Sequence, residues 1–393
     1  MTYGRERPGM KSRIFLILCN FLIFNCNTIA EFNTKNTFLE WQSGVLQIMK
    51  ENINLFTKDQ KNPLFLTHDI SDKEINLDLE NIIIPLLIDD IRLVSGLEIR
   101  LSEKRASNNY LYYSVPFFHD YEFNLIKSSK KTEIGLSKAN FKLKGEEFKK
   151  VNYITFYFST NSAEVRLSVW PIKKSKKISD GVLTLTFDDG PKDNLLAAEI
   201  LKKYNIPATA YIMPNALGTK DFLTSKELRS ISKKNWDIES HHETPFTYFS
   251  KDSLDKEISD VESFLINNKY KKKNFHLAYP LGKTNESVIE AVSKKFSTAR
   301  IASGGIETIP PVNLHMLRAY NVLKTTTPKE LREVIKRTKE SKQWLILMFH
   351  HIKDEPVDDI DYSTENFEEL AKIIKESDIS IMTMNEVWNK YLK

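Results

Sequence analysis

The sequence predicts two domains of different fold class, an all-β sandwich-like domain over residues 31–172 and an α/β domain over residues 178–393. Short runs rich in β-branched and aromatic residues occupy the first region, whereas strand-like and helix-like runs alternate in the second. Between them lies a Lys-rich stretch, PIKKSKK. Because a charge run of this kind is usually solvated, we expect residues 173–177 to be a linker.

The first region has the pattern of a β-sandwich. Several of its short runs alternate apolar and polar residues, and polar clusters separate them. The strand-like runs are at residues 82–88, 91–101, 111–117, 153–158 and 164–170. Residues 38–55 have apolar residues at helical spacing instead, which favours one helix. Trp41, Trp170 and the tyrosines of residues 110–113 could stack on sugars, although aromatic residues also dominate sandwich cores.

The second region has the pattern of a parallel sheet or a (β/α) barrel, because strands and helices alternate with short connections. The strand-like runs are at residues 182–187, 209–213, 276–279, 344–349 and 379–382. The helix-like runs are at residues 195–204, 225–234, 253–267, 285–296, 328–339 and 364–376. In a barrel of this kind, catalytic residues gather at the C-terminal ends of the strands.

The N-terminus has the order of a secretory signal. Basic residues precede an apolar run at residues 14–24, and a polar stretch then ends in Ala30. The run is shorter than the roughly 20 apolar residues of a membrane span. We therefore expect residues 1–30 to be a signal peptide, with an uncleaved N-terminal anchor as the alternative. Either interpretation predicts an exported protein that is periplasmic, in the cell envelope or extracellular, with membrane contact only through an uncleaved leader.

Charge and cysteine content exclude several classes of protein. Residues 1–30 carry a net charge of +3, which leaves only +2 of the total +5 for the rest of the chain. Net charge therefore gives no reason to expect a nucleic-acid partner. Cys19 and Cys26 are the only cysteines and both lie in the leader. A cysteine nucleophile or a Cys-type zinc site in the mature chain is thereby excluded, and His and carboxylate groups remain as possible metal ligands.

Two adjacent carboxylates follow the first strand of the second region, in the segment LTLTFDDGP. A bare Asp-Gly turn would be the ordinary interpretation of such a sequence. However, Asp188 and Asp189 are placed where a buried strand reaches the catalytic end of a barrel, and unpaired carboxylates there would be costly. We therefore treat them as candidate site residues.

Two histidine pairs also follow strand-like runs. His241 and His242 come after WDIES, and His350 and His351 come after WLILMF. A lone histidine is usually a core or surface residue, but two pairs at strand ends favour a functional site. We expect His351 to be structural or substrate-facing.

With these residues in view, residues 178–393 resemble the NodB-type polysaccharide deacetylase family, carbohydrate esterase family 4. The first family motif matches as TFDDGP around Asp188, the second begins at Ser240-His241, and the last appears as LMFH, ending at His350. The third appears as AYPLG, which contains Tyr279, Pro280 and Leu281. The resemblance implies a distorted (β/α) barrel of NodB type, with the first domain as an accessory domain.

By this resemblance, Asp188 is the general base, Asp189 and His241 are ligands of a divalent metal, usually Zn²⁺, and His350 is the general acid. The backbone N–H of Leu281 would help to bind the oxyanion. The implied activity is hydrolysis of acetyl groups, mainly N-acetyl, on a cell-envelope or extracellular polysaccharide. A metal ion would lower the pKa of its bound water toward about 7.

Three departures from the family pattern leave the site incomplete. The second motif should place another histidine at position 245, which is Pro245 here, so we consider His242 or Glu243 as substitute ligands. The arginine of the third motif is replaced by Ala278, and we expect Arg318 to contact Asp188 instead, with a surface or barrel-end salt bridge as the alternative. The fourth motif is not recognisable. A glycan-binding protein with impaired catalysis would be consistent with such a site. The first domain alone would also permit a surface adhesin, but the intact TFDDGP motif and His350 disfavour that alternative.

Overall fold

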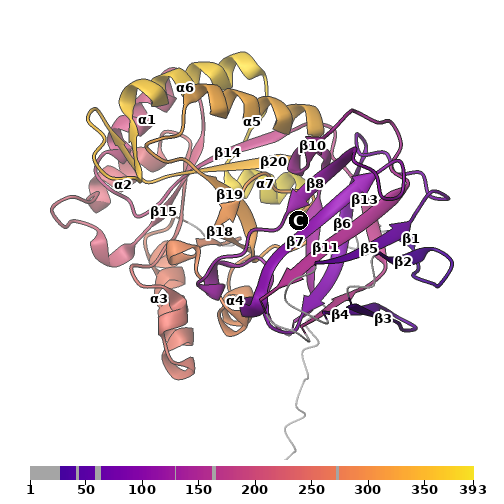
Figure 1. The fold of residues 1–393 in the computed structure, drawn as a ribbon. Helices are drawn as coiled ribbons and strands as arrows, with labels where there is room; N and C mark the ends of the chain where they lie inside the picture. Colours follow the sequence, from indigo (N-terminus) through magenta and orange to yellow (C-terminus); the bar gives the residue numbers. More distant parts are fainter. Residues whose placement is uncertain (1–26, 41–43, 58–62, 129, 162–164, 271–273) are drawn as a thin grey trace, which may run out of the picture.

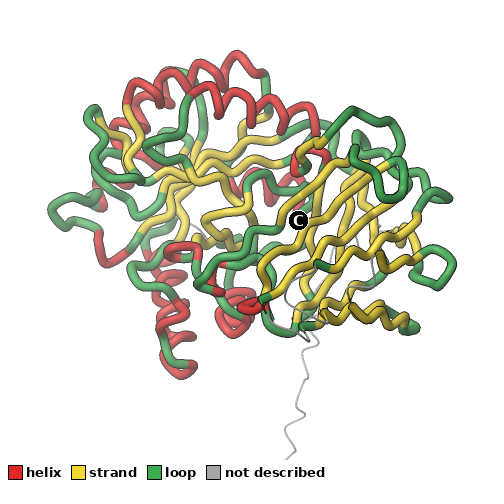
Figure 2. The backbone as a smooth tube through the Cα atoms, viewed as in Figure 1, coloured by secondary structure: helices red, strands yellow, loops and turns green. Residues whose placement is uncertain are grey.

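The computed structural model describes residues 27–40, 44–57, 63–128, 130–161, 165–270 and 274–393. Two bodies lie side by side in it, a β-sandwich drawn in indigo to magenta and an α/β barrel drawn in magenta to yellow (Figure 1). Apart from short 3₁₀ turns, the helices belong to the barrel (Figure 2). The two predicted fold classes and their order along the chain are confirmed.

The sandwich consists of two antiparallel sheets. One sheet has the order β1-β13-β6-β12-β4-β3, with β9 also paired to β6, and the other has the order β10-β8-β7-β11-β5-β2. The strands are β1 (Asn27–Ala30), β2 (Thr37–Glu40), β3 (Gly44–Ile48), β4 (Ile53–Thr57), β5 (Leu64–Asp69), β6 (Glu80–Ile88), β7 (Val94–Ser102), β8 (Tyr110–Ser114), β9 (Thr132–Leu136), β10 (Lys142–Lys144), β11 (Tyr153–Thr160), β12 (Arg166–Val169) and β13 (Ile172–Lys176).

Alternation along the strands forms the sandwich core. In β11, Ile154, Phe156 and Phe158 are fully buried while their neighbours are half-buried, as expected when one face of a strand packs inward. The predicted helix over residues 38–55 is wrong, because this segment contributes β2, β3 and β4. Its apolar residues pack across the two sheets, and such tertiary pairing overrides local periodicity.

The predicted linker is also a strand. Lys173 and Lys174 in β13 pair with Ile83 and Ile82 of β6, and β13 is flanked on its other side by β1. The lysines of β13 extend to acidic partners on neighbouring strands, such as Glu133 at 2.7 Å from the Lys173 Nζ. Of the predicted leader, residues 1–26 lie outside the described residues, and so does Trp41 of the first domain.

The second body is a closed barrel of parallel strands. Strands β14 to β20 pair in ring order, since β14 contacts both β15 and β20, and the short β23 extends the sheet beside β14. The strands are β14 (Val182–Phe187), β15 (Ala208–Ile212), β16 (Trp236–Ser240), β17 (His276–Ala278), β18 (Thr298–Gly304), β19 (Leu317–Asn321), β20 (Trp344–Phe349) and β23 (Ser380–Ile381). A seven-stranded ring with helices outside it confirms the distorted (β/α) barrel.

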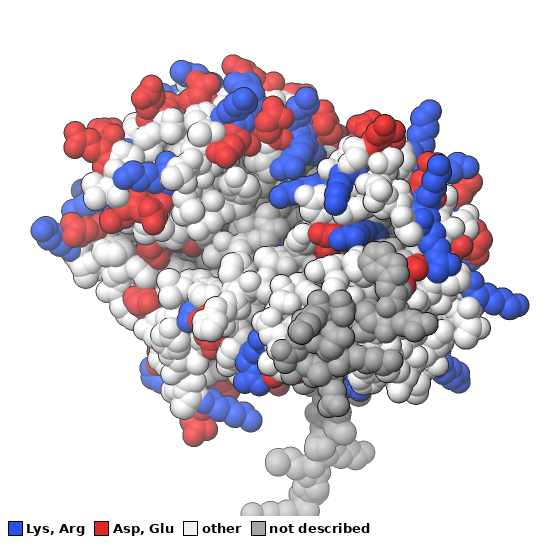
Figure 3. Space-filling view, viewed as in Figure 1, with Lys and Arg blue, Asp and Glu red and all other residues white. Residues whose placement is uncertain are grey.

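The helices cover the outside of the barrel. They are α1 (Asn194–Lys203), α2 (Ser225–Ser232), α3 (Lys251–Asn267), α4 (Glu286–Ser293), α5 (Pro328–Ser341), α6 (Thr364–Ser377) and α7 (Met384–Val387). Thr224 and Thr327 begin α2 and α5 with capping boxes, which satisfy backbone N–H groups at the helix ends. Acidic and basic side chains are interspersed over α5 and α6 (Figure 3). No helix in the described part of the chain is long and apolar enough to cross a membrane.

Alternate residues of each barrel strand face either the helices or the barrel interior. On β14, Leu183, Leu185 and Phe187 pack in the core beneath the helices. Val182 packs in a second cluster with residues of β15, β19 and β20. This second cluster fills the barrel interior, so the residues in phase with Val182 point inward. The alternation therefore decides which polar residues can meet inside the barrel.

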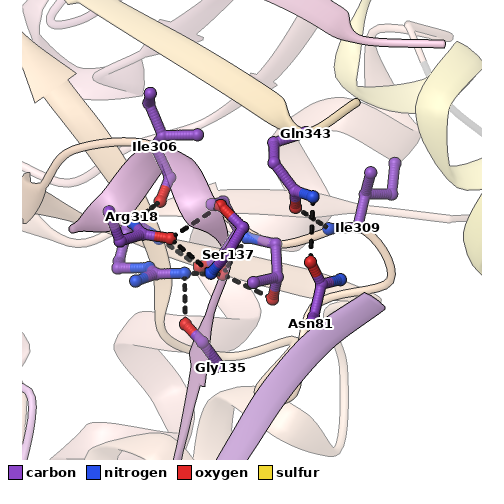
Figure 4. Close-up of polar contacts among 10 residues, drawn as sticks. Asn81, Gly135, Ser137, Ile306, Ile309, Arg318 and Gln343 are labelled. Carbon is purple, nitrogen blue, oxygen red and sulfur yellow. Dashed lines mark hydrogen bonds and ion pairs between the residues drawn. The ribbon is translucent and has the colours of Figure 1, made fainter. Parts of the chain in front are cut away.

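The sandwich and the barrel are joined by buried polar contacts (Figure 4). The Nε2 of Gln343 donates to Oδ1 of Asn81 at 2.9 Å, and the Nη2 of Arg318 donates to the carbonyl of Gly135 at 2.9 Å. A Cβ on Gly135 would lie 2.7 Å from the Thr308 hydroxyl, so only glycine allows β9 to approach the barrel this closely. Buried donors that lose their partners cost about 1–3 kcal/mol each, which favours a fixed orientation of the two bodies.

Candidate active site

Polar side chains from four different strands and the residues that follow them converge toward the C-terminal end of the barrel. Asp188 and Asp189 follow β14, His241 follows β16, Arg300 lies on β18 and His350 follows β20. Asp188, His241 and Arg300 are at most 4% exposed. Continuing the alternation of each strand brings Asp188, His241 and His350 to the inner face, so the structure brings together four residues that the sequence singled out.

Asp188 forms an ion pair with Arg300. The contact is short and both side chains are buried. Arg300 is held in turn by Met348, whose Sδ lies 3.0 Å from Nη1, and by the ring of Tyr211, whose centroid lies 4.8 Å from the guanidinium carbon. The ion pair fixes the position of the Asp188 carboxylate, and a carboxylate is one of the groups that can act as a general base.

Asp189 turns toward His241 because its backbone is left-handed, with φ at 69°. Its Oδ1 lies 3.3 Å from Nε2 of His241. The carbonyl of Ala278 lies 2.8 Å from the other ring nitrogen, Nδ1, and can only accept. The Nδ1 atom therefore carries a proton, and Nε2 is directed at Asp189.

The carboxylates act on the pKa of His241. Burial alone would lower this pKa, but the hydrogen bond to Asp189 and the charges of Asp188 and Asp189 outweigh burial and raise it. For Asp189, burial would raise the pKa, and the contact with His241 lowers it below the usual range. The pair therefore favours an ionised carboxylate.

His350 lies close enough to this group to be affected by its charges. Burial lowers the pKa of His350, and the negative charges of Asp188 and Asp189 offset only part of that effect. Its Nδ1 is buried and has no hydrogen-bond partner among the described residues. No side chain in the described part of the chain therefore orients His350 through a hydrogen bond to Nδ1.

The second histidine of each pair points away from the barrel interior. His242 packs against Phe246, with ring centroids 5.1 Å apart, and its Nε2 lies 3.4 Å from Glu257 of α3. Glu243 instead accepts from the backbone N–H of Asn215 at 3.0 Å. The structure thus corrects the expectation that His242 or Glu243 joins Asp189, because His242 contacts Glu257 and Glu243 contacts Asn215.

His351 also points outward, where it meets a carboxylate. Its Nδ1 lies 2.7 Å from Oδ2 of Asp193, and this contact raises the pKa of His351. Asp193 was not singled out in the sequence, although it follows TFDDGP by only two residues. The pair ties the loop after β14 to the strand β21 (His351–Lys353), which agrees with a structural role for His351.

The prediction that Arg318 contacts Asp188 is wrong. Its Nη2 instead lies 2.6 Å from Oε1 of Glu307 and 2.9 Å from the Gly135 carbonyl. On β19, Leu317 and Ala319 belong to the inner cluster, so Arg318 points outward toward the sandwich. The arginine beside Asp188 is Arg300, which the sequence analysis missed. A lone arginine in the apolar run TARIA was the available signal.

The loop after β17 carries the third motif. Tyr279 is 1% exposed and its hydroxyl donates to the His315 carbonyl at 3.2 Å, so it supports the loop and does not face a substrate. Pro280 is buried at the start of a 3₁₀ turn (Pro280–Gly282). Leu281 is 64% exposed and left-handed, with φ at 56°. Its N–H makes no hydrogen bond within the described residues and remains available to a ligand.

The donor set for a metal ion is incomplete. Asp189 and His241 are suited to hold a divalent cation, because Nε2 of His241 is directed at the carboxylate and Nδ1 is fixed by a carbonyl. Catalytic zinc sites use three protein ligands, yet the described residues contain no group of three or more His, Cys, Asp or Glu that could hold a metal. Pro245 occupies the position of the missing histidine.

Comparison with known proteins identifies the domain. Residues 175–297 match the family model "Polysaccharide deacetylase". The chain is 32% identical over 141 residues to a poly-beta-1,6-N-acetyl-D-glucosamine N-deacetylase of Staphylococcus epidermidis, a match that covers 31% of this chain and 48% of that protein. It is 28% identical to the enzyme of the same name from Staphylococcus aureus, with the same coverage. The chain thus spans about half the length of these curated relatives.

Solved structures also resemble the chain. A Streptococcus pyogenes deacetylase in complex with acetate is 23% identical, with a TM-score of 0.36, and the match covers 38% of this chain and 69% of that one. A family 4 carbohydrate esterase from Streptomyces lividans is 15% identical, with a TM-score of 0.36. This match covers 51% of this chain and 92% of that one. The family model, the curated relatives and the TFDDGP motif thus identify a polysaccharide deacetylase domain in the part of the chain that includes residues 175–297.

Proposed function

We propose that the protein hydrolyses N-acetyl groups on an extracellular or cell-envelope polysaccharide. The single observation that carries this proposal is the buried Asp188–Arg300 pair beside Asp189 and His241 at the barrel mouth. A carboxylate that is kept ionised can accept a proton from an attacking water. The family match makes an acetylated polysaccharide the substrate class to test first.

In this proposal, Asp188 takes a proton from water as the water oxygen forms a bond with the acetyl carbonyl carbon. The N–H of Leu281 donates to the oxyanion that develops. The bond between carbon and nitrogen then breaks, and His350 gives a proton to the leaving amine, which releases acetate and a free amino sugar. Arg300 keeps Asp188 in place throughout.

We further propose that Asp189 and His241 hold a divalent cation, Zn²⁺ in the first instance. Such a cation polarises a bound water and the acetyl carbonyl when it is present. With two protein ligands in place of three, we expect affinity to be lower than at a complete zinc site. Chelator should therefore remove the ion readily, and added Zn²⁺ should restore activity.

The relatives suggest the first substrate. Both staphylococcal relatives are named as deacetylases of poly-beta-1,6-N-acetyl-D-glucosamine. We propose a polymer of this chemical class, a neutral N-acetylated hexosamine chain, as the substrate of this protein. Since such chains are found outside the cytoplasm, export through the predicted leader would bring enzyme and substrate together.

A glycan-binding role without catalysis is the second candidate. The observation that favours it is the incomplete ligand set, in which Pro245 stands where the family has a histidine and His242 packs against α3. A binder of this kind would bind the glycan and release no acetate.

Acetate release tests the proposal. The full chain is incubated with hexamers of β-1,6-linked and of β-1,4-linked N-acetylglucosamine, with and without chelator, and acetate is measured over time. We expect release from at least one hexamer, loss of release with chelator and its return with Zn²⁺. Hexamer binding without acetate release under any of these conditions would establish the binder instead.

A further inference from the structure

A groove lies between the barrel mouth and the sandwich. Its volume is about 560 Å³, within the range of small-molecule sites. Phe118 and Phe123 of the sandwich line one side, and Leu281, Ser303 and Asn321 of the barrel line the other. The groove adjoins the candidate active site at two points, because Leu281 belongs to both and Asn321 pairs with Met348, two residues before His350.

The sandwich side of the groove is held rigidly. The buried amide of Asn124 accepts from the N–H of Phe118 at 2.6 Å and donates to the carbonyl of Phe118 at 3.3 Å. The rings of Phe118 and Phe123 pack edge to face, with centroids 6.1 Å apart. Phe118 nevertheless remains 41% exposed. An exposed ring on a fixed backbone is a preorganised apolar surface, which loses little entropy when a ligand covers it.

The barrel side is tied to this wall through Lys283. Its Nζ lies 2.5 Å from Oδ2 of Asp120 and 3.7 Å from Oε2 of Glu122, and it donates to the hydroxyl of Tyr248 at 3.2 Å. The ammonium also lies 5.1 Å from the centre of the Phe123 ring. These contacts pair the charge of Lys283 with carboxylates of the sandwich, and Lys283 does not line the groove.

The chemistry of the lining indicates the ligand. The described residues that line the groove include no Asp, Glu, Lys or Arg, and they offer phenyl rings, glycine backbone, a serine hydroxyl and an asparagine amide. A neutral sugar ring matches this lining, because its C–H face can cover a phenyl ring while its hydroxyl groups reach polar atoms at the edge. An acidic polymer would find no cation there.

We propose that this groove is a subsite for a sugar unit next to the one that is deacetylated, with Phe118 as its stacking platform. The sandwich then contributes to substrate binding directly and is not only an attached domain. The proposal rests on the proposed function for its substrate, a neutral chain of N-acetylated hexosamine. It predicts that longer chains bind better than short ones because they reach Phe118.

Chain-length dependence tests the subsite. KM and kcat are measured for the dimer and the hexamer of β-1,6-linked N-acetylglucosamine, with the wild-type protein and with Phe118→Ala. We expect the wild-type KM to fall with chain length, and Phe118→Ala to raise the hexamer KM about tenfold. Phe118→Trp should restore most of the loss. Tyr121→Ala is the matched control, since Tyr121 is 48% exposed on the same segment but does not line the groove.

Binding measurements separate this subsite from the proposed function. Hexamers of both linkages are titrated calorimetrically into Asp188→Asn and into the double variant with Phe118→Ala. One outcome is that the wild-type protein releases no acetate, while the double variant binds the hexamer about tenfold more weakly than Asp188→Asn does. In that case the subsite is supported and the proposed function fails. An unchanged hexamer KM in Phe118→Ala, or binding of neither hexamer to Asp188→Asn, overturns the subsite.

Discussion

Two arginines on adjacent barrel strands have nearly the same burial and different tasks. Arg300 on β18 is 0% exposed and pairs with Asp188 at the mouth of the barrel. Arg318 on β19 is 2% exposed and pairs with Glu307 at the contact with the sandwich. Both pairs must offset the cost of removing two charges from water.

The difference between the two arginines lies in which face of the strand each occupies. Arg300 is out of phase with Ala299 and Ile301, which pack under the helices, so it points into the barrel. Arg318 is out of phase with Leu317 and Ala319, which fill the interior, so it points out. The face of the strand therefore separates an arginine that pairs with Asp188 inside the barrel from one that contacts the sandwich.

The largest effect should come from Arg300→Met. This change leaves the buried Asp188 without its charged partner, so the carboxylate loses the contact that holds it in place. We expect acetate release to fall by about 10³-fold, within the range known for general-base catalysis. The measurement is kcat/KM on the N-acetylglucosamine hexamer. Activity within threefold of the wild type would show that Asp188 does not need this partner.

Arg318→Met should affect stability much more than turnover. It leaves Glu307 buried without its partner and removes the hydrogen bond to Gly135, and breaking a buried pair of this kind costs about 3–5 kcal/mol. Urea unfolding monitored by circular dichroism measures this loss. The matched comparison is kcat of the folded fraction, which we expect to fall less than threefold. A loss as large as that of Arg300→Met would remove the distinction between the two arginines.

A smaller effect concerns how the stability of the sandwich depends on pH. Burial lowers the pKa of His68 from 6.5 to about 4, against the opposing effect of a hydrogen bond to the Asn36 backbone. Because the unfolded chain binds a proton near pH 6.5 and the folded chain does not, stability is full above pH 6.5 and falls as the pH drops toward 4. The loss should reach about 3 kcal/mol.

Unfolding of His68→Gln at pH 7, 5.5 and 4.5 tests this expectation, with Asn36 and the rest of the sandwich unchanged. We expect the free energy of unfolding to fall less steeply with decreasing pH in the variant than in the wild-type protein. If the free energy of unfolding depended on pH identically in both proteins, His68 would not be the cause of the loss of stability at acid pH.

Much of this architecture could be predicted from the sequence because the patterns are local. Alternation of strands and helices after residue 178 indicated the barrel, and the segment LTLTFDDGP placed Asp188 and Asp189 at a strand end. The two histidine pairs also marked strand ends correctly. In each pair the first histidine faces in, as the alternation of β16 and β20 requires.

The wrong predictions concern segments whose structure is determined by contacts with residues far away in the chain. The segment 38–55 has helical spacing yet forms three strands, because β2 pairs with the distant β5 and β4 pairs with the distant β12. The lysines of β13 suggested a linker, but they extend to acidic groups on neighbouring strands. The choice of Arg318 over Arg300 failed because which face of a strand points inward depends on the barrel as a whole.

The most direct test of the account is acetate release by Asp188→Asn. Asparagine keeps the size of the side chain and cannot accept a proton as a carboxylate does. With the N-acetylglucosamine hexamer as substrate, the account predicts that acetate release falls by at least about 10²-fold while circular dichroism and hexamer binding stay close to those of the wild type. Release at the wild-type rate would contradict the assignment of Asp188 as the base.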